Sequence, residues 1–252
     1  MSLQEIAYAL DPVLWCQGVL SLEPDSWQAS VLRSTSKRII LNCTRQSGKS
    51  TVTSALALHT ALYHPGSLIL CLSPTLRQSG ELFHNIIRFY GDAPTVPART
   101  ESALRLELEN GSRIISLPGK EQNVRGYANV SLLVVDEAAR VPDDLYYSIR
   151  PMLAVSGGKM IALSTPFGRR GWFFNEWENG QGWERHTITA HQCPRISSTF
   201  LDEERRSMPS PWFRAEYFCE FTDVEDAVFS YDEVMAATSE EIEPLDLGVA
   251  EW

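Results

Sequence analysis

Residues 38–51 constrain the fold of this chain more than any other stretch. They open with a short apolar run that is long enough for a buried strand, and a tight polar loop follows. The loop ends in Gly48-Lys49-Ser50-Thr51, and residues 52–63 read as a helix rich in Ala and Leu. This order is typical of a phosphate-binding loop, in which backbone N–H groups and a helix N-terminus favour negative charge at one point.

In such a loop, Lys49 reaches the β and γ phosphates of a nucleotide and the Ser50 hydroxyl holds a Mg²⁺ ion. Cys43 stands where the usual pattern has its first glycine, a residue favoured there because it accepts a positive φ without strain. Gly-Lys-Ser-Thr is also short enough to occur by chance. The alternative interpretation is a polar helix N-terminus with a solvated lysine, so other segments have to decide.

Residues 132–137 read Leu-Leu-Val-Val-Asp-Glu and form the second informative segment. Four consecutive apolar residues favour a parallel strand buried on both faces. Two carboxylates at its end are costly to desolvate without a cationic partner, which Mg²⁺ and a nucleotide would supply. Asp136 would hold the ion through its water shell, and Glu137 would orient and deprotonate the attacking water. A solvated Asp-Glu pair is the alternative, and the phosphate-binding loop argues against it.

Strands and helices alternate through the rest of the chain. The pattern predicts strands at 67–72 and 159–163, helices at 76–90 and 142–153, and a hairpin formed by 103–109 and 112–117. An α/β fold with a parallel sheet follows, and such sheets bind ligands at their strand ends.

Two further features take their interpretation from this context. Gln28 precedes the first strand, and its carboxamide is able to donate and accept at once, as adenine reading requires, although a lone Gln is usually a surface helix residue. Ser164-Thr165-Pro166 follows a strand, and small hydroxyl residues there can sense the γ phosphate and pass on its loss. A plain turn would explain the same three residues.

Composition limits the classes of function. The chain has 252 residues and a formal net charge of −10, which argues against a broad basic surface for nucleic acid, so any DNA contact should be local and salt-sensitive. The five cysteines lack a Cys-x-x-Cys spacing, which suggests reduced thiols in a cytoplasm. The histidines are scattered, so no zinc site is predicted. No apolar run approaches the roughly 20 residues that span a bilayer.

Taken together, these segments resemble the ATPase half of the large terminase subunit, the DNA-packaging motor of tailed bacteriophages. The resemblance covers residues 27–229 and is carried by the motifs at 44–51, 134–139, 164–166 and 213–221. Cys43 fits this family, whose members commonly lack the first glycine and carry an arginine in the loop. The implied fold is a three-layer αβα P-loop NTPase of the RecA-like, ASCE type, with a mainly parallel sheet and a small C-terminal lid subdomain.

The resemblance also implies a site for ATP and Mg²⁺. Gln28 corresponds to the adenine-reading glutamine, Ser50 and Asp136 to the Mg²⁺ ligands, and Glu137 to the catalytic carboxylate. Residues Ser164, Thr165 and Pro166 correspond to the motif that couples hydrolysis to movement. The loop residues expected to bind the nucleotide are Arg45, Gln46, Ser47, Gly48, Lys49, Ser50 and Thr51.

Terminases place an arginine finger from a neighbouring subunit against the γ phosphate, where such a group is worth about 10³ to 10⁵ in rate. Arg125, followed by Gly126 before the second motif, is the candidate for this role. A solvated loop cation is the alternative interpretation of Arg125. Arg45, inside the phosphate-binding loop, is the rival and would act on its own subunit.

The expected organisation has four parts: an N-terminal segment with the adenine-reading motif (1–30), the ATPase core (31–170), the lid (171–222), and a linker with the start of a nuclease domain (223–252). Residues 245–248 resemble the first strand of that nuclease, and Asp246 matches its metal-binding aspartate. The other acidic residues of a two-metal site are absent, so we expect no DNA cleavage. Either the sequence is an excised or truncated half, or the nuclease lies on another polypeptide.

The implied function is ATP hydrolysis that moves double-stranded DNA into a procapsid. The implied partners are that DNA, a portal protein, the small terminase subunit and further copies in a ring on the portal. The implied location of the protein is the cytoplasm of the host bacterium, transiently on the procapsid, and no membrane partner is implied. A helicase-type ATPase would want a second RecA-like domain, for which too few residues follow Gly168. A regulator that binds nucleotide without turnover would not need Glu137, and a small-molecule kinase would need an acceptor pocket.

Overall fold

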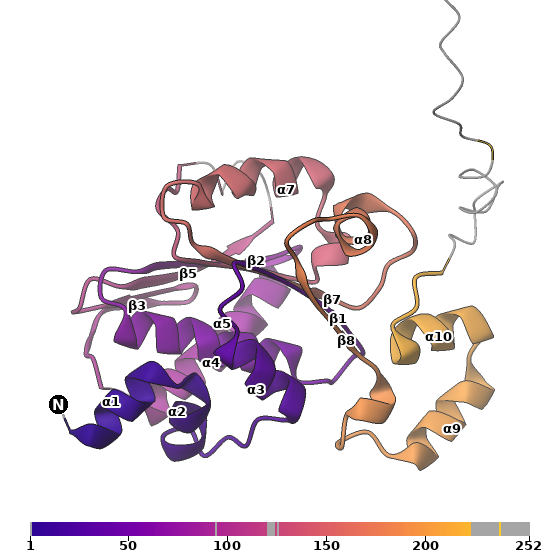
Figure 1. Cartoon of the computed structure of the whole chain (residues 1–252), viewed down its shortest axis with the longest axis horizontal. Helices are drawn as coiled ribbons and strands as arrows, with labels where there is room; N and C mark the ends of the chain where they lie inside the picture. Colours follow the sequence, from indigo (N-terminus) through magenta and orange to yellow (C-terminus); the bar gives the residue numbers. More distant parts are fainter. Residues whose placement is uncertain (1, 94, 120–123, 125, 223–236, 238–252) are drawn as a thin grey trace, which may run out of the picture.

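In the part of the chain that the structure describes, eight strands form one sheet in the order β3-β4-β5-β2-β6-β7-β1-β8 (Figure 1). The structure is a computed structural model and describes residues 2–93, 95–119, 124, 126–222 and 237 of the 252. The strands are β1 Arg38–Cys43, β2 Leu68–Ser73, β3 Ala98–Ser102, β4 Arg105–Leu108, β5 Arg113–Pro118, β6 Leu132–Asp136, β7 Lys159–Ser164 and β8 Glu184–Ile188.

The six strands from β5 to β8 in that order run parallel. At the other end of the sheet, β4 pairs antiparallel with β5, and β3 pairs antiparallel with β4. The predicted hairpin is present as β4 and β5, and Gly111 holds a φ of 82° in the turn between them. The sequence analysis did not predict β3. All five of its residues are exposed, so it carries no apolar pattern that would reveal a strand.

Helices cover the sheet on both faces (Figure 1). The helices α1 to α5 lie on one face and α7 and α8 on the other, while α9 and α10 lie beyond the β8 end. The predicted helix at 142–153 is divided into an α-helix and a 3₁₀ turn. The helices are α1 Leu3–Leu10, α2 Pro12–Gly18, α3 Ser26–Arg33, α4 Lys49–Tyr63, α5 Leu76–Asp92, α7 Asp143–Ile149, α8 Gly171–Glu178, α9 Ser198–Ser207 and α10 Ser210–Phe218, with 3₁₀ turns η1 Ala138–Arg140, η2 Arg150–Leu153 and η3 Ala190–Gln192.

The central strands are buried on both faces, as their continuous apolar runs predict. In β1, Ile39 and Leu41 join the core beneath α4 and α5, and Ile40 joins the core beneath α7 and α8. The two apolar layers flank one mainly parallel sheet, which confirms the predicted three-layer α/β fold. None of the helices among the described residues is long and apolar enough to cross a membrane.

Residues 171–188 lie in the layered body rather than apart from it. Trp172 of α8 is 1% exposed and stacks on Tyr146 of α7, with ring centroids 3.9 Å apart, and its Nε1 donates to the Val141 carbonyl at 3.0 Å. The strand β8 pairs with β1 at the edge of the sheet. The expected lid at 171–222 therefore begins with a helix and a strand that pack onto the core.

Candidate nucleotide site

Three motifs meet at one edge of the sheet because their strands are neighbours. Strand β7 lies between β1 and β6, and all three run parallel, so their carboxyl ends meet at the same edge. The phosphate-binding loop follows β1, residues 164–166 end β7, and Asp136 ends β6. One strand, β7, therefore separates the strand before the loop from the strand that ends in the acidic pair.

The phosphate-binding loop turns into α4 through backbone conformations that most residues avoid. Gly48, the residue before α4, has a φ of 88°, and Gln46 has a φ of 57°. A Cβ atom on Gly48 would lie 2.6 Å from Nε2 of Gln28, closer than two such atoms can approach. Both the positive φ and the contact with Gln28 favour glycine at this position.

Glu137 lies between two cations. Its Oε1 is 3.5 Å from Nζ of Lys49, and its Oε2 accepts from Nη1 of Arg140 at 2.9 Å. The same Arg140 nitrogen lies 3.2 Å from Oγ1 of Thr165. One arginine thus joins the acidic pair at the end of β6 to the hydroxyl motif at the end of β7, while Lys49 joins that pair to the loop.

Asp136 is buried in a manner that suits a divalent cation. Its exposed fraction is 6%, and burial together with the neighbouring Glu137 carboxylate raises the pKa of Asp136 to about 6, while Lys49 acts in the opposite direction. A buried carboxylate that lacks a full counter-charge fits a cation that takes oxygen ligands. The Ser50 hydroxyl is another oxygen ligand of this kind. Among the described residues, no group of three or more His, Cys, Asp or Glu side chains forms a metal cage by itself, so phosphates and water would have to complete the coordination.

Glu137 itself holds a left-handed backbone conformation, with φ 49° and ψ 42°. This region costs a residue other than glycine of the order of 1–2 kcal/mol, and such residues gather at functional sites. Its N–H donates to Oδ1 of Asp136 at 3.0 Å, which fixes the turn that directs its carboxylate toward Lys49.

Gln28 lies against the loop. It is 4% exposed, its Oε1 accepts from the Asp25 N–H at 2.9 Å, and its Nε2 donates to the Gly48 carbonyl at 3.3 Å. Both ends of the carboxamide are therefore engaged within the protein. Adenine reading by Gln28 stays a prediction, and it would require these two contacts to rearrange.

The C-terminal end of α10 contacts both the end of β1 and the phosphate-binding loop that follows it. Nε of Arg45 lies 2.7 Å from Oε2 of Glu216, and Oγ1 of Thr44 donates to the Glu216 carbonyl at 2.8 Å. Nδ2 of Asn42 donates to the Cys219 carbonyl, also at 2.8 Å. The rival finger Arg45 is thus paired with the predicted lid, whereas Arg125 lies outside the described residues.

The remaining predicted residues occupy the same strand ends. Ser47 is buried, and Ser50 and Thr51, in the first turn of α4, are partly buried. Ser164, Thr165 and Pro166 are buried at the end of β7. Within the part of the chain described, the Ser164 hydroxyl makes no hydrogen bond.

Two arginines at the site were not predicted. Arg140 follows Glu137 by three residues, and that i,i+3 spacing was the available signal. Arg195 donates to the Ser47 carbonyl at 2.7 Å and pairs with Asp25 at 2.6 Å. It is 170 residues from Asp25 in sequence, in a loop without a motif, so no sequence signal pointed to it.

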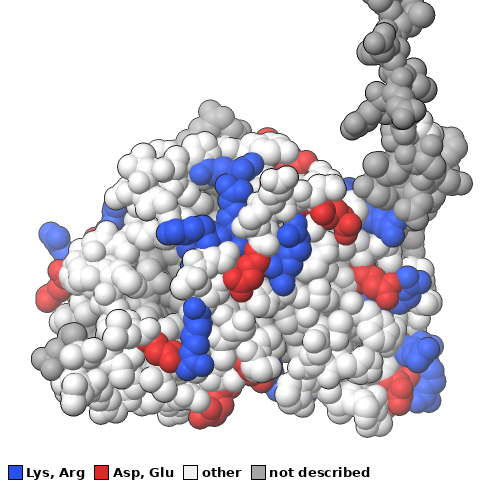
Figure 2. All heavy atoms as spheres, viewed as in Figure 1, with Lys and Arg blue, Asp and Glu red and all other residues white. Residues whose placement is uncertain are grey.

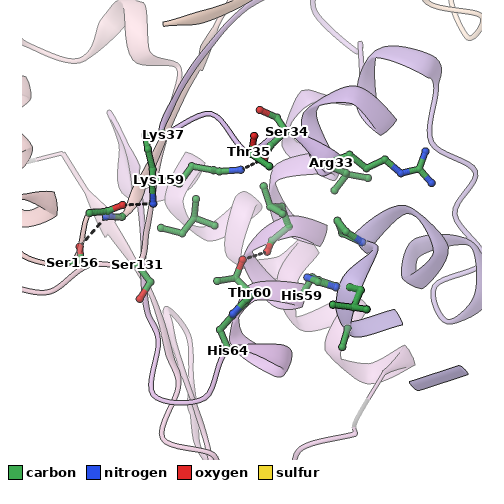
Figure 3. A pocket seen from close by; sticks show the side chains of 18 residues that line it. Arg33, Ser34, Thr35, Lys37, His59, Thr60, His64, Ser131, Ser156 and Lys159 are labelled. Atoms are coloured by element: carbon green, nitrogen blue, oxygen red, sulfur yellow. Dashed lines mark hydrogen bonds between the residues drawn. The ribbon is translucent and has the colours of Figure 1, made fainter. Parts of the chain in front are cut away.

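A pocket of about 630 Å³ lies at the opposite, amino-terminal edge of the sheet (Figure 3). Among the residues that the structure describes, its lining includes Lys37 and Lys159 and contains no Asp or Glu. Nζ of Lys37 donates to the Gly157 carbonyl at 2.5 Å, and Nζ of Lys159 donates to the Ser34 carbonyl. These two lysines tie the loop before β1 to the loop before β7.

On the face shown in Figure 2, basic and acidic side chains lie in small interspersed groups.

Comparisons with known proteins agree with this geometry. The family model of the terminase large subunit, T4likevirus-type, N-terminal, matches residues 40–235. The large terminase subunit of Thermus phage G20c is 27% identical in an alignment that covers 84% of this chain and 51% of that protein. The large terminase ATPase domain of Thermus phage P74-26 is similar in structure, with a TM-score of 0.73 and 25% identity over 84% of this chain and all of that one.

The large terminase of a thermophilic bacteriophage, in complex with ADP, shares the fold, with a TM-score of 0.60 and 15% identity over 88% of this chain and 54% of that one. This chain spans about half the length of the curated relatives it matches. The matched residues include the loop from β1 to α4, the acidic end of β6 and the hydroxyl motif that ends β7. The chain belongs to the family of N-terminal domains of the large terminase subunit, of the T4-like type.

Proposed function

We propose that this chain is an ATPase that hydrolyses ATP at the edge formed by β1, β7 and β6 and so powers the packaging of double-stranded viral DNA. The observation that carries the proposal is the pairing of Lys49 with Glu137 at 3.5 Å, which joins a phosphate-binding loop to a carboxylate able to act as a base. Family membership and the fold shared with large terminase ATPase domains support the same activity.

Each residue has a role that follows from its place. Loop N–H groups and the N-terminus of α4 would bind the phosphates, and Lys49 would lie over the β and γ phosphates. Glu137 would then exchange its contact with Lys49 for the attacking water, orient it and accept its proton. Arg140 is suited to holding Glu137 between turnovers, because it reaches both that carboxylate and Thr165.

Mg²⁺ would be held by the Ser50 hydroxyl and, through water, by Asp136. When bound, the ion neutralises charge on the phosphate oxygens during transfer. Two arginines remain candidates for completing the site against the γ phosphate. Arg125 would act on a neighbouring subunit, and Arg45 would act in its own subunit after leaving Glu216.

The wider assignment extends these roles to the assembled motor. Double-stranded DNA, a portal protein, a small terminase subunit and further copies of this chain in a ring are its proposed partners, in the cytoplasm of a bacterial host. Gln28 is proposed to read adenine, and residues 164–166 to pass the loss of the γ phosphate to neighbouring elements. Asp246 lies outside the described residues, and the expected lack of nuclease activity stays a prediction.

The activity is tested by removing Lys49 and Glu137 separately. Lys49→Ala should abolish phosphate release from ATP, and Glu137→Gln should slow it about 10²- to 10⁴-fold, the usual share of a general base. Circular dichroism checks that both proteins are folded. Lys37→Ala is the matched control, because it removes a lysine from the opposite edge of the sheet and should leave hydrolysis unchanged. Undiminished turnover by Lys49→Ala would remove the assignment.

The DNA part of the proposal has its own measurement. Stimulation of hydrolysis is compared with double-stranded and single-stranded DNA at several salt concentrations, because contacts to phosphates weaken as salt rises. Preference for the duplex supports packaging. Preference for single strands, together with strand separation, would favour a helicase instead.

A further inference from the structure

Arg195 joins two segments that are far apart in the sequence. It lies in the turn between η3 and α9, at the start of the helical part of the predicted lid. Its Nη1 and Nη2 donate to the two carboxylate oxygens of Asp25 at 3.2 and 2.6 Å, and Nη2 also donates to the Ser47 carbonyl at 2.7 Å. One guanidinium therefore binds both the N-cap residue of α3 and the backbone of the phosphate-binding loop.

The contacts continue from Asp25 back to the loop. The Asp25 N–H donates to Oε1 of Gln28, and Nε2 of Gln28 donates to the Gly48 carbonyl, so the five residues Arg195, Asp25, Gln28, Gly48 and Ser47 form a closed ring. The ring is tightly packed: a Cβ on Gly48 would lie 2.6 Å from Nε2 of Gln28 and 3.4 Å from Nη2 of Arg195.

Holding these two carbonyls has a consequence for the phosphate-binding N–H groups. The peptide unit is planar and trans, so the C=O of one residue and the N–H of the next point in opposite directions. Fixing the Ser47 and Gly48 carbonyls on the side of Arg195 and Gln28 fixes the N–H groups of Gly48 and Lys49 on the other side. Because the charge of Arg195 is already balanced by Asp25, its contribution here is one of position rather than of charge.

We propose that Arg195 is a positioning residue for nucleotide binding: it holds the phosphate-binding loop against the N-terminal end of α3 and thereby sets the affinity for ATP. This inference rests on the proposed function of the site. The inference also links the turn before α9 to the same network. A nucleotide that displaced residues of the ring would therefore act directly on the predicted lid.

The test measures equilibrium binding of a fluorescent, non-hydrolysable ATP analogue, with steady-state hydrolysis of ATP measured alongside. Arg195→Ala should weaken binding of the adenine analogue about tenfold or more, the effect of losing a hydrogen bond to a charged group. KM should rise correspondingly, with kcat within about twofold. Arg195→Lys keeps the charge but not the planar fork, so its affinity should be intermediate.

Arg33→Ala is the matched control. Arg33 also grips a carboxylate, that of Asp11, at 2.6 Å, and its side chain is 53% exposed compared with 48% for Arg195. It lies at the far end of α3 and does not belong to the ring, so its loss should leave the affinity for ATP unchanged. Asp25→Asn removes the charge of the other partner in this ion pair and should also weaken binding of the ATP analogue. This variant tests the inference if Arg195→Ala does not fold.

Two results would overturn the inference. One is an unchanged affinity in folded Arg195→Ala and Asp25→Asn. The other is a fall in kcat with KM and affinity unchanged, since that would give Arg195 a part in the chemistry instead. Failure of the proposed function looks different: the wild-type chain would bind the adenine analogue and lose affinity on Arg195→Ala, yet would release no phosphate from ATP.

Discussion

At the scale of single residues, Gly48 and Glu137 both occupy the left-handed backbone region, with φ values of 88° and 49°. Glycine accepts this conformation without strain, whereas a glutamate does not. At Gly48 the conformation turns the loop into α4. At Glu137 it directs a carboxylate toward Lys49, in the turn between β6 and η1.

Gly48→Ala and Gly66→Ala together separate backbone strain from the contact with Gln28. Both positions have a positive φ, 88° and 74°, but a Cβ at Gly66 would have no atom within 4 Å. We expect both variants to lose about 1–2 kcal/mol of stability in urea unfolding, because alanine is strained there. Only Gly48→Ala should also weaken nucleotide binding, since it alone displaces Gln28. Equal affinities in the two variants would show that this contact is unimportant.

At the scale of elements, α8 and α10 follow the core in sequence and contact it in different ways. The helix α8 buries Trp172 against Tyr146 in the apolar layer beside the sheet. The end of α10 meets the loop through backbone carbonyls and one ion pair, that of Arg45 with Glu216. Polar contacts exchange with water more readily than buried aromatic surface does, so α10 is the better suited of the two to move with the nucleotide.

Trp172→Ala tests whether α8 is part of the core. Loss of a fully buried aromatic side chain should destabilise the whole domain by about 3–5 kcal/mol in urea unfolding. Trp212→Ala makes the same deletion in α10, where the side chain is 54% exposed, and should destabilise the domain less than Trp172→Ala does. A small effect of Trp172→Ala on global unfolding would mean that α8 opens independently, as a lid would.

At the scale of the whole molecule, the parallel sheet gathers the chemistry at one edge. Among the described residues, that edge carries Lys49, Asp136 and Glu137, and the end of α10 and the turn at Arg195 contact the loop beside them. The opposite edge carries two lysines that tie loops together. An arginine supplied by a neighbouring copy would enter at the nucleotide edge.

A mixing experiment tests that last step. Arg125→Ala and Glu137→Gln proteins are assayed alone and together. If Arg125 acts between subunits, an interface that pairs an intact arginine with an intact glutamate should recover part of the ATPase activity. The control mixes Lys49→Ala with Glu137→Gln, whose changes lie in one site, 3.5 Å apart, so neither partner supplies what the other lacks. Absence of recovery in the first mixture at high protein concentration would favour Arg45, acting in its own subunit.

The sequence alone determined the α/β fold, the loop at Lys49 and the acidic strand end at Asp136, because apolar runs and short motifs are local patterns of neighbouring residues. It missed β3, whose exposed residues leave no pattern. Only the tertiary structure brought Arg140 to Thr165, Glu216 to Arg45, and Arg195 to Asp25 and Ser47. These contacts join segments 25 to 171 residues apart, and a single charged residue in a loop gives no local sign of the partner that folding will place beside it.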